Sequence, residues 1–430
     1  MAAPISAAAY YRNHYPWDHL VAFLTRHGDE LCQREFAIEG AYYKRYVVAR
    51  NAAELKKAVW QFPDVKSFHV GPVYSGRVAR HAEREKSWPV RRELVFDIDL
   101  TDYDFLELES PDGGVDMARC DKAWPVCATA VFVLEWLLKQ AFGFKEFVVV
   151  YSGRRGVHLY VCDDKAMSLT NEARSAITDF LKYDASQDKL RASDNLVTMA
   201  NTQGLSEALR YAFETFYIDK MGLFDDPAAR VDFVERLGLS EQHLPMIANL
   251  AEDVLEKPDG RAMWEFVKTK VESLPHQWMR DRLDDMICAY VWPRIDANVS
   301  RGLNHLLKAP FVAHPKSGRV AVVTDGADYY RFAPAAAPRL GDLRNPTAFF
   351  QMRDAMSWWR PCHVLTQEEE EVEKKKGELA KTVPPNAPTP DVDMEDLAGV
   401  QRPPGVQKRK KKAFVRKRSP LSQVYTEPSQ

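Results

Sequence analysis

This sequence of 430 residues lacks the signals that mark several classes of protein. We find no run of about 18 apolar residues, which a membrane-spanning helix would need. The N-terminus, MAAPISAAAYYRNHYPWDHL, has no basic segment followed by the long apolar stretch of a secretory signal. No internal repeat is present. We therefore expect a protein that stays inside the cell and does not enter a membrane.

The chain also has few cysteines and no overall excess of positive charge. Its six cysteines (Cys32, Cys120, Cys127, Cys162, Cys288 and Cys362) include no CxxC pair, which excludes a disulfide framework and predicts reduced thiols. The formal net charge of -2 hides an asymmetry, because the segment KRKKKAFVRKR (408–418) carries eight positive charges and leaves a net charge of -10 on the rest. Any contact of the body with nucleic acid must therefore be local.

The composition indicates a globular body followed by a tail. With 46% hydrophobic, 28% charged and 11% aromatic residues, the chain as a whole is of the globular class. Its length allows two or three domains of roughly 150 residues. Near residue 366 the sequence changes to an acidic run, a Pro-rich stretch and the basic segment, which bury too little apolar surface to offset the entropy cost of ordering. We predict a disordered tail over 366–430.

The body carries both strand and helix signals, so we predict an α/β fold. The segment 124–142 is apolar nearly all round and ends before Gly143, which is typical of a buried helix. From about residue 171 to 291 strand signals vanish and amphipathic stretches dominate, which indicates a helical insertion. Runs rich in β-branched and aromatic residues predict strands at Lys44–Arg50, Glu93–Leu100, Glu146–Tyr151, Val157–Cys162 and Arg319–Thr324.

The first motif with chemical content is ELVFDIDLTDYD, residues 93–104. On a strand its alternate apolar residues would face the core, while Asp97 and Asp99 would project together from the other face. Carboxylates roughly 7 Å apart along a strand can converge on two divalent cations about 3.5–4 Å apart. An exposed acidic strand edge would give the same pattern. DIDLT also fits the DxDxT motif of haloacid-dehalogenase-like phosphatases, but the later acidic pair that they need has one candidate, Asp284–Asp285, in helix-like sequence.

The second motif is VVVYSGRRGVHLYV, residues 148–161. It predicts two strands joined by a tight turn from Ser152 to Gly156, with His158 on the second strand. Guanidinium groups pair with phosphate oxygens and stay charged, so Arg154, Arg155 and His158 around this turn would suit a triphosphate. A surface hairpin with solvated arginines is the alternative.

The third motif lies in residues 290–322, YVWPRIDANVSRGLNHLLKAPFVAHPKSGRVAV. Asp296 follows an aromatic-rich run, Lys308 ends a short apolar stretch that we predict to be helical, and His314 lies in a predicted loop. Asp296 would be a third carboxylate of a metal site, and Lys308 and His314 would contact phosphate. Singly, they could be a capping Asp, a solvated Lys and a loop His. Their joint occurrence favours one site.

Together the three motifs resemble those of the small, catalytic subunit of eukaryotic and archaeal-type DNA primase, in the same order and at similar separations. The similarity extends to REFAIEGAYYKRY (34–46) and VGPVYS (70–75), and so covers most of residues 1–335 apart from the helical insertion. It implies a mixed-sheet archaeo-eukaryotic primase fold. The catalytic domain would comprise 1–170 and 290–365, with the helical insertion at 171–289 and the disordered tail at 366–430.

The resemblance also implies a function, which is the DNA-templated synthesis of short RNA primers for DNA replication. The enzyme would be a DNA-directed RNA polymerase and nucleotidyltransferase that uses ribonucleoside triphosphates on a single-stranded DNA template. Its partners would be the primase large subunit and a replicative DNA polymerase, in the nucleus. By position, Asp97, Asp99 and Asp296 would hold Mg²⁺ or Mn²⁺; the triphosphate would contact Ser152, Arg154, Arg155, His158, Lys308 and His314; and Glu35, Tyr43 and Arg45 would lie near the nucleotide pocket.

The chain departs from the family at one point. The eukaryotic family usually carries a four-cysteine zinc cluster shortly after the DxD strand, where this chain reads LELESPDGGVDMARCDKAWPVC. Only Cys120 falls on a family cysteine, whereas Ala123 occupies another and Cys127 lies beyond the cluster. A closed zinc site needs four ligands, so we expect no structural zinc.

Other interpretations remain open at this point. A phosphatase would leave the second and third motifs unexplained, and a non-catalytic nucleic-acid-binding module predicts a missing carboxylate, although all three are present. The basic segment 408–418 is either a nuclear localisation signal, which the family's work on nuclear DNA favours, or a sequence-independent nucleic-acid patch. Six basic residues before the DxD strand would either contact the template backbone or form a solvated loop: Arg77, Arg80, Arg84, Lys86, Arg91 and Arg92.

Overall fold

The computed structural model describes residues 5–78, 87–110, 113–182, 204–238, 249–275, 277–324 and 329–343. They belong to one unit, Met1–His363. The predicted tail at 366–430, and the part of the predicted 290–365 segment that follows residue 343, lie outside the described residues.

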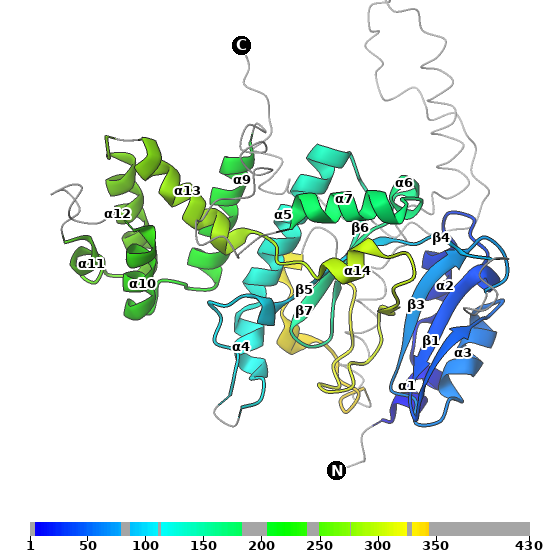
Figure 1. The fold of residues 1–430 in the computed structure, drawn as a ribbon. Helices are drawn as coiled ribbons and strands as arrows, with labels where there is room; N and C mark the ends of the chain where they lie inside the picture. Colours follow the sequence, from blue (N-terminus) through cyan, green and yellow to red (C-terminus); the bar gives the residue numbers. More distant parts are fainter. Residues whose placement is uncertain are drawn as a thin grey trace, which may run out of the picture. The chain divides into compact units, whose positions relative to one another are not determined.

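The first sheet is antiparallel and is built mainly from the N-terminal strands (Figure 1). Its order is β2 (Tyr43–Val47), β1 (Arg34–Glu39), β3 (Ser67–Tyr74) and β4 (Pro89–Arg91), and β8 (Leu307–Lys308) also pairs with β3. Helices α1 (Ala7–Asn13), α2 (Trp17–Thr25) and α3 (Ala52–Trp60) accompany it. The ring of Trp17 stacks on Phe68 of β3 with centroids 5.3 Å apart, so the apolar side chains of the N-terminal helices attach to this sheet.

The second sheet contains the two central motifs. Its order is β5 (Leu94–Asp99), β7 (Gly156–Val161) and β6 (Phe147–Tyr151), with every pair antiparallel. The described strands thus form two antiparallel sheets rather than the mixed sheet that we predicted. The reason is that β6 and β7 are joined by a tight hairpin, and β7 enters between β6 and β5.

Four of the five predicted strands are confirmed, with ends shifted by up to three residues. The fifth, Arg319–Thr324, is wrong as a regular strand, because the segment changes partners along its length. It forms isolated bridges between Val320 and Ala313 and between Val323 and Val150. The backbone N–H of Thr324 then donates to the carbonyl oxygen of Val149 at 2.9 Å, so only the end of the segment follows β6.

Helix α5 (Trp124–Phe142) has the predicted bounds and ends at Gly143, whose φ of 63° is left-handed. By length and composition this helix could span a membrane, which corrects our expectation that no such segment exists. However, 67% of its most apolar window is buried inside the protein. It packs against β5 and β7 on the one hand and against the helices of the insertion on the other. These contacts are typical of a core helix.

The described residues between 171 and 291 form helices and no strand. An aromatic cluster holds several of them together, with Phe213 5.1 Å from Trp264 and 5.6 Å from Tyr290 between ring centroids. The helices are α7 (Asn171–Leu181), α9 (Leu205–Ala212), the π-helix η4 (Phe213–Lys220), α10 (Pro227–Leu237), α11 (Leu250–Asp253), α12 (Gly260–Glu272) and α13 (Gln277–Val291). Shorter helices elsewhere are α4 (Met117–Lys122), α6 (Asp164–Met167) and α14 (Ala297–Arg301).

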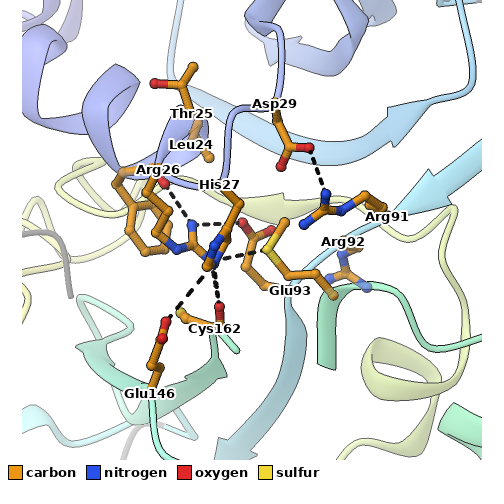
Figure 2. Close-up of polar contacts among 12 residues, drawn as sticks. Leu24, Thr25, Arg26, His27, Asp29, Arg91, Arg92, Glu93, Glu146 and Cys162 are labelled. Atoms are coloured by element: carbon orange, nitrogen blue, oxygen red, sulfur yellow. Dashed lines mark hydrogen bonds and ion pairs between the residues drawn. The ribbon is translucent and has the colours of Figure 1, made fainter. Parts of the chain in front are cut away.

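A buried carboxylate joins the two sheets, and Figure 2 shows its contact with Arg26. Glu93, immediately before β5, accepts two hydrogen bonds from Arg34 of β1, at 2.9 and 3.1 Å. Arg26, after α2, lies 3.3 Å from the same carboxylate and also donates to the carbonyl oxygen of Cys162, after β7. Burial alone would raise the pKa of Glu93, but the charges of Arg34 and Arg26 more than offset it and hold that pKa well below its usual range. The Glu93 carboxylate is therefore ionised at neutral pH.

We expect Glu93→Gln to lower the free energy of unfolding by about 3–5 kcal/mol, because it leaves two buried guanidinium groups without a countercharge. Equilibrium urea denaturation measures the change. The matched control is Glu54→Gln, which removes an exposed ion pair with Arg50 and should change little. Equal effects of the two substitutions would contradict the assigned role of Glu93.

Candidate active site

Strands β5 and β7 place the first carboxylates beside the second motif. In their antiparallel register Asp97 lies opposite His158, and Asp99 lies opposite Gly156. Phe96 and Ile98 are fully buried, whereas both aspartates are partly exposed, as the predicted alternation requires. The Nε2 atom of His158 lies 3.5 Å from the Oδ1 atom of Asp97.

The third carboxylate arrives from far along the chain. Ile295 forms a bridge with Ile98, and the backbone N–H of Asp296 donates to the carbonyl oxygen of Asp97 at 3.0 Å. The pKa of Asp97 is raised, chiefly by burial; the neighbouring His158 opposes this, and the negative charges of Asp99 and Asp296 add to it. The three predicted carboxylates are thus close enough to repel one another.

Each carboxylate nevertheless has a partner of its own. Asp99 accepts a hydrogen bond from the Nε of Arg155 at 2.9 Å, and Asp296 caps α14 by accepting one from the N–H of Asn298 at 2.9 Å. Among the described residues, no three Asp, Glu, His or Cys side chains are arranged as a ready-made metal site. The donor set itself, three carboxylates of which Asp99 and Asp296 help to raise the pKa of Asp97, fits a hard divalent cation.

The Ser152–Gly156 turn is the predicted hairpin, between β6 and β7. Its backbone closes with a hydrogen bond from the N–H of Ser152 to the carbonyl oxygen of Gly156, at 2.9 Å. Gly153 has a φ of 86°, and a Cβ there would lie 2.9 Å from the Cβ of His314 and 3.0 Å from the carbonyl oxygen of Arg319. Only glycine fits both the conformation and the space. The hairpin is therefore seated directly against the loop that carries His314.

A cavity of about 270 Å³ opens where these segments meet. Eight of the twelve predicted site residues line it: Asp97, Asp99, Ser152, Arg154, Arg155, His158, Lys308 and His314. Asp296, Glu35, Tyr43 and Arg45 do not. The structure thus brings the residues predicted to contact phosphate and two of the carboxylates to one cavity. Asp296 does not line it but is hydrogen-bonded to Asp97 through the backbone.

Glu35, Tyr43 and Arg45 form the adjoining wall of the first sheet. Glu35 is buried on β1 and accepts hydrogen bonds from the Nε of Arg45 at 2.8 Å and the hydroxyl of Tyr74 at 2.9 Å. Arg45 also donates to the carbonyl oxygen of Asn304 at 3.4 Å. Asn304 lies two residues before Leu306, which lines the cavity. The ring of Tyr43 is half exposed and packs edge to face with the ring of His69, with the two centroids 5.5 Å apart.

Sequence reasoning missed His69, Leu306 and Leu307, which also line the cavity. It also assigned Lys308 to the end of a helical stretch, which is wrong. Helix α14 ends at Arg301, and Lys308 lies on β8, where it pairs with His69 of β3. His69 directly precedes the VGPVYS segment that we noted, but nothing local to that segment indicates that β8 will pair with it.

Positive groups crowd one side of the cavity. Burial, together with the charges of Lys308 and Arg154, lowers the pKa of His314 to about 4. Burial and Lys308 likewise lower the pKa of His69 to about 4. The pKa of Lys308 is itself lowered, first by burial. Such a cluster would gain stability from a bound anion, because opposite charge removes the mutual repulsion.

Two of the basic residues before β5 are engaged inside the protein. Arg92 is buried, and Arg91 pairs with Asp29 and Asp164, so neither is free for a template backbone. Arg80, Arg84 and Lys86 lie outside the described residues. Arg92 is therefore neither a template contact nor part of a solvated loop, the two alternatives that the sequence left open for it.

Cys120 and Cys127 are buried, and burial raises the pKa of both thiols. Burial in apolar surroundings keeps thiols protonated and unreactive. Cys362 lies outside the described residues. The expectation that the chain holds no structural zinc stays a prediction.

We expect the His314 imidazole to be neutral in the free protein at pH 7 and to titrate near pH 4. Pyrophosphate in the cavity should raise its pKa, so that binding takes up a proton at pH values between the free and bound midpoints. NMR titration of histidine signals with and without pyrophosphate measures both midpoints, and His314→Gln assigns the signal. The signal of His19, exposed on α2, is the reference that pyrophosphate should leave unmoved. A midpoint that pyrophosphate does not move would contradict the anion site.

The chain is similar to known proteins over most of its length. The model of the family described as DNA primase small subunit matches residues 96–325, which include both carboxylate motifs, the hairpin and His314. A DNA primase small subunit of Schizosaccharomyces pombe is 33% identical over 354 residues, covering 78% of this chain and 76% of that protein. The Drosophila melanogaster protein of the same name is 28% identical over 78% of this chain and 79% of its own length. DNA primase small subunit PriS of Methanothermobacter thermautotrophicus is 26% identical over 80% of this chain and 98% of its own length. The chain therefore belongs to the DNA primase small subunit family.

Proposed function

We propose that this chain is the catalytic subunit of a DNA primase, which copies a single-stranded DNA template into short RNA primers from ribonucleoside triphosphates. The observation that carries the proposal is one cavity with carboxylates on β5 and phosphate-type contacts on the hairpin and on Lys308 and His314. Nucleotidyl transfer needs carboxylates that hold cations and basic groups that bind phosphate, because negative charge must be neutralised while a hydroxyl attacks the α-phosphate.

The carboxylates would hold the cations of this reaction. Asp97, Asp99 and Asp296 supply oxygen ligands suited to Mg²⁺ or Mn²⁺. When bound, the ions would lower the pKa of the attacking 3′-hydroxyl and offset the charge of the phosphates. Arg155, which neutralises Asp99 in the structure, would then be free to turn to the triphosphate in the same cavity.

The basic wall would hold the β- and γ-phosphates and the pyrophosphate leaving group. Arg154 and Arg155 offer planar forks that match phosphate oxygens. Ser152, His158, Lys308 and His314 surround the same space. Glu35, Tyr43 and Arg45 would form the wall beyond it, on the first sheet.

The phosphatase alternative has little support in the structure. Its second acidic pair would be Asp284–Asp285, but these residues lie on α13, and Asp284 accepts a hydrogen bond from Arg210 of α9 at 2.8 Å. Neither residue lines the cavity that contains Asp97 and Asp99.

The association with other proteins is part of the proposal. The relatives' name, small subunit, supports a complex with a large subunit, and through it with a replicative DNA polymerase. We also propose the primase fold with its domain bounds, the disordered tail and a nuclear location directed by the basic segment 408–418.

We expect Asp97→Asn to abolish template-dependent incorporation of ribonucleotides while leaving the unfolding midpoint unchanged or raised, because it removes mutual repulsion among the carboxylates. The assay follows primer formation and pyrophosphate release by the chain with its large subunit. The matched control is Asp104→Asn, whose exposed carboxylate pairs with Arg294. Robust synthesis by Asp97→Asn, or release of inorganic phosphate instead of pyrophosphate by the unmodified chain, would contradict the proposal.

Arg154→Gln should chiefly raise the KM for the nucleotide, on the order of tenfold, because Arg154 would address phosphate rather than the reacting hydroxyl. Steady-state kinetics against ribonucleotide concentration separate KM from kcat. Arg236→Gln, which removes a surface ion pair with Asp232 on α10, is the control. An unchanged KM would return the hairpin to a purely structural role.

A further inference from the structure

Arg92 is a buried arginine that the chemistry described above does not use. It directly precedes Glu93 (Figure 2) and is only 2% exposed. Its Nη1 donates to the carbonyl oxygens of Val299 at 2.9 Å and Gly302 at 3.1 Å. Burial lowers its pKa to about 10, so the group stays charged at neutral pH.

The two carbonyls belong to the C-terminal end of α14. This helix has five residues, Ala297–Arg301, with Asp296 as its N-cap and Gly302 as its C-cap. A helix this short is not stable by itself, and its last carbonyl groups have no partner within the helix. A guanidinium group there satisfies them and interacts favourably with the helix dipole.

Two further hydrogen bonds attach α14 to β5, which begins just after Arg92. The hydroxyl of Ser300 donates to the carbonyl oxygen of Val95 at 2.8 Å, and the backbone N–H of Asp296 donates to the carbonyl oxygen of Asp97 at 3.0 Å. Arg92 therefore holds one end of the helix while Asp97 holds the other. Together with the packing of α14 against α7, these hydrogen bonds hold Asp296 beside Asp97.

We propose that Arg92 is a positioning residue for the cation site, which sets Asp296 against Asp97 and Asp99 by holding the far end of α14. The inference rests on the proposed function, because it concerns the carboxylates that would bind the cations.

The test measures Mn²⁺ binding to the full chain by the electron paramagnetic resonance signal of free Mn²⁺, alongside urea denaturation. Arg92→Met should weaken Mn²⁺ binding by about 10–100-fold, as loss of a residue supporting a metal ligand does. Arg92→Lys keeps the charge and should recover part of the affinity. Hydrogen exchange of the amides of residues 296–302, measured without metal, should rise in both variants.

The matched control is Arg230→Met in the helical insertion. Arg230 is also buried. Its hydrogen-bond partners among the described residues are carbonyl oxygens, including those of Phe224 at 2.7 Å and Lys257 at 2.8 Å. Its loss should lower stability as Arg92→Met does and leave Mn²⁺ affinity unchanged. A merely structural role of Arg92 would give the same result for both arginines.

If Arg92→Met does not fold, Arg92→Lys and Ser300→Ala decide, because each weakens one attachment of α14. Unchanged Mn²⁺ affinity in the folded variants, together with loss of binding in Asp296→Asn, would overturn the inference and leave the proposed function standing. Absence of Mn²⁺ binding to the unmodified chain, or binding that persists in Asp97→Asn and Asp296→Asn, would overturn both.

Discussion

The buried carboxylate of Glu93 is the interaction on which the arrangement of the cavity depends. It holds Arg34 of the first sheet and Arg26 after α2 at the start of β5. The cavity takes His69 and Lys308 from the first sheet and Asp97 and His158 from the second. An apolar contact between the sheets would tolerate small sliding movements, whereas a bidentate ion pair does not, because any slip exposes an unpaired buried charge.

The charge of the site is local rather than global. The carboxylates and the cationic groups share one small cavity, and the salt bridge between Arg155 and Asp99 lies where the two meet. The lowered pKa values of His69 and His314 keep both imidazoles neutral at pH 7, which limits the positive charge buried on the basic side of the cavity. A body with a net negative charge can therefore still present an attractive surface to a polyphosphate, because screening and distance remove the remote charges.

The parts of the fold that sequence predicted are those that local patterns determine. The alternation around Asp97 and Asp99 predicted their shared face, and the apolar run before Gly143 predicted the bounds of α5. The errors arise where distant segments meet. Lys308 was expected in a helix because its apolar neighbours have no local strand pattern, and only its pairing with His69 makes β8.

The candidate site divides in the same way. The three motifs were visible because each has its residues close together in sequence. His69 was missed because a lone histidine on a strand has no local signal of function, and Arg92 was misassigned because a basic cluster gives no sign of the carbonyl groups that will surround one member. Burial and hydrogen-bond partners of this kind are properties of the assembled chain.

The pairing of β3 with β8 joins residues more than two hundred positions apart, and the contact of Asp97 with Asp296 joins residues nearly two hundred positions apart. A chain emerging from the ribosome can form its first sheet and the β5, β6 and β7 sheet long before Lys308 and His314 are available. Local contacts form quickly, whereas distant strand pairing is slow. The cavity is thus completed only after Lys308 and His314 have been synthesised, so a nascent chain carries no finished cavity until most of its body exists.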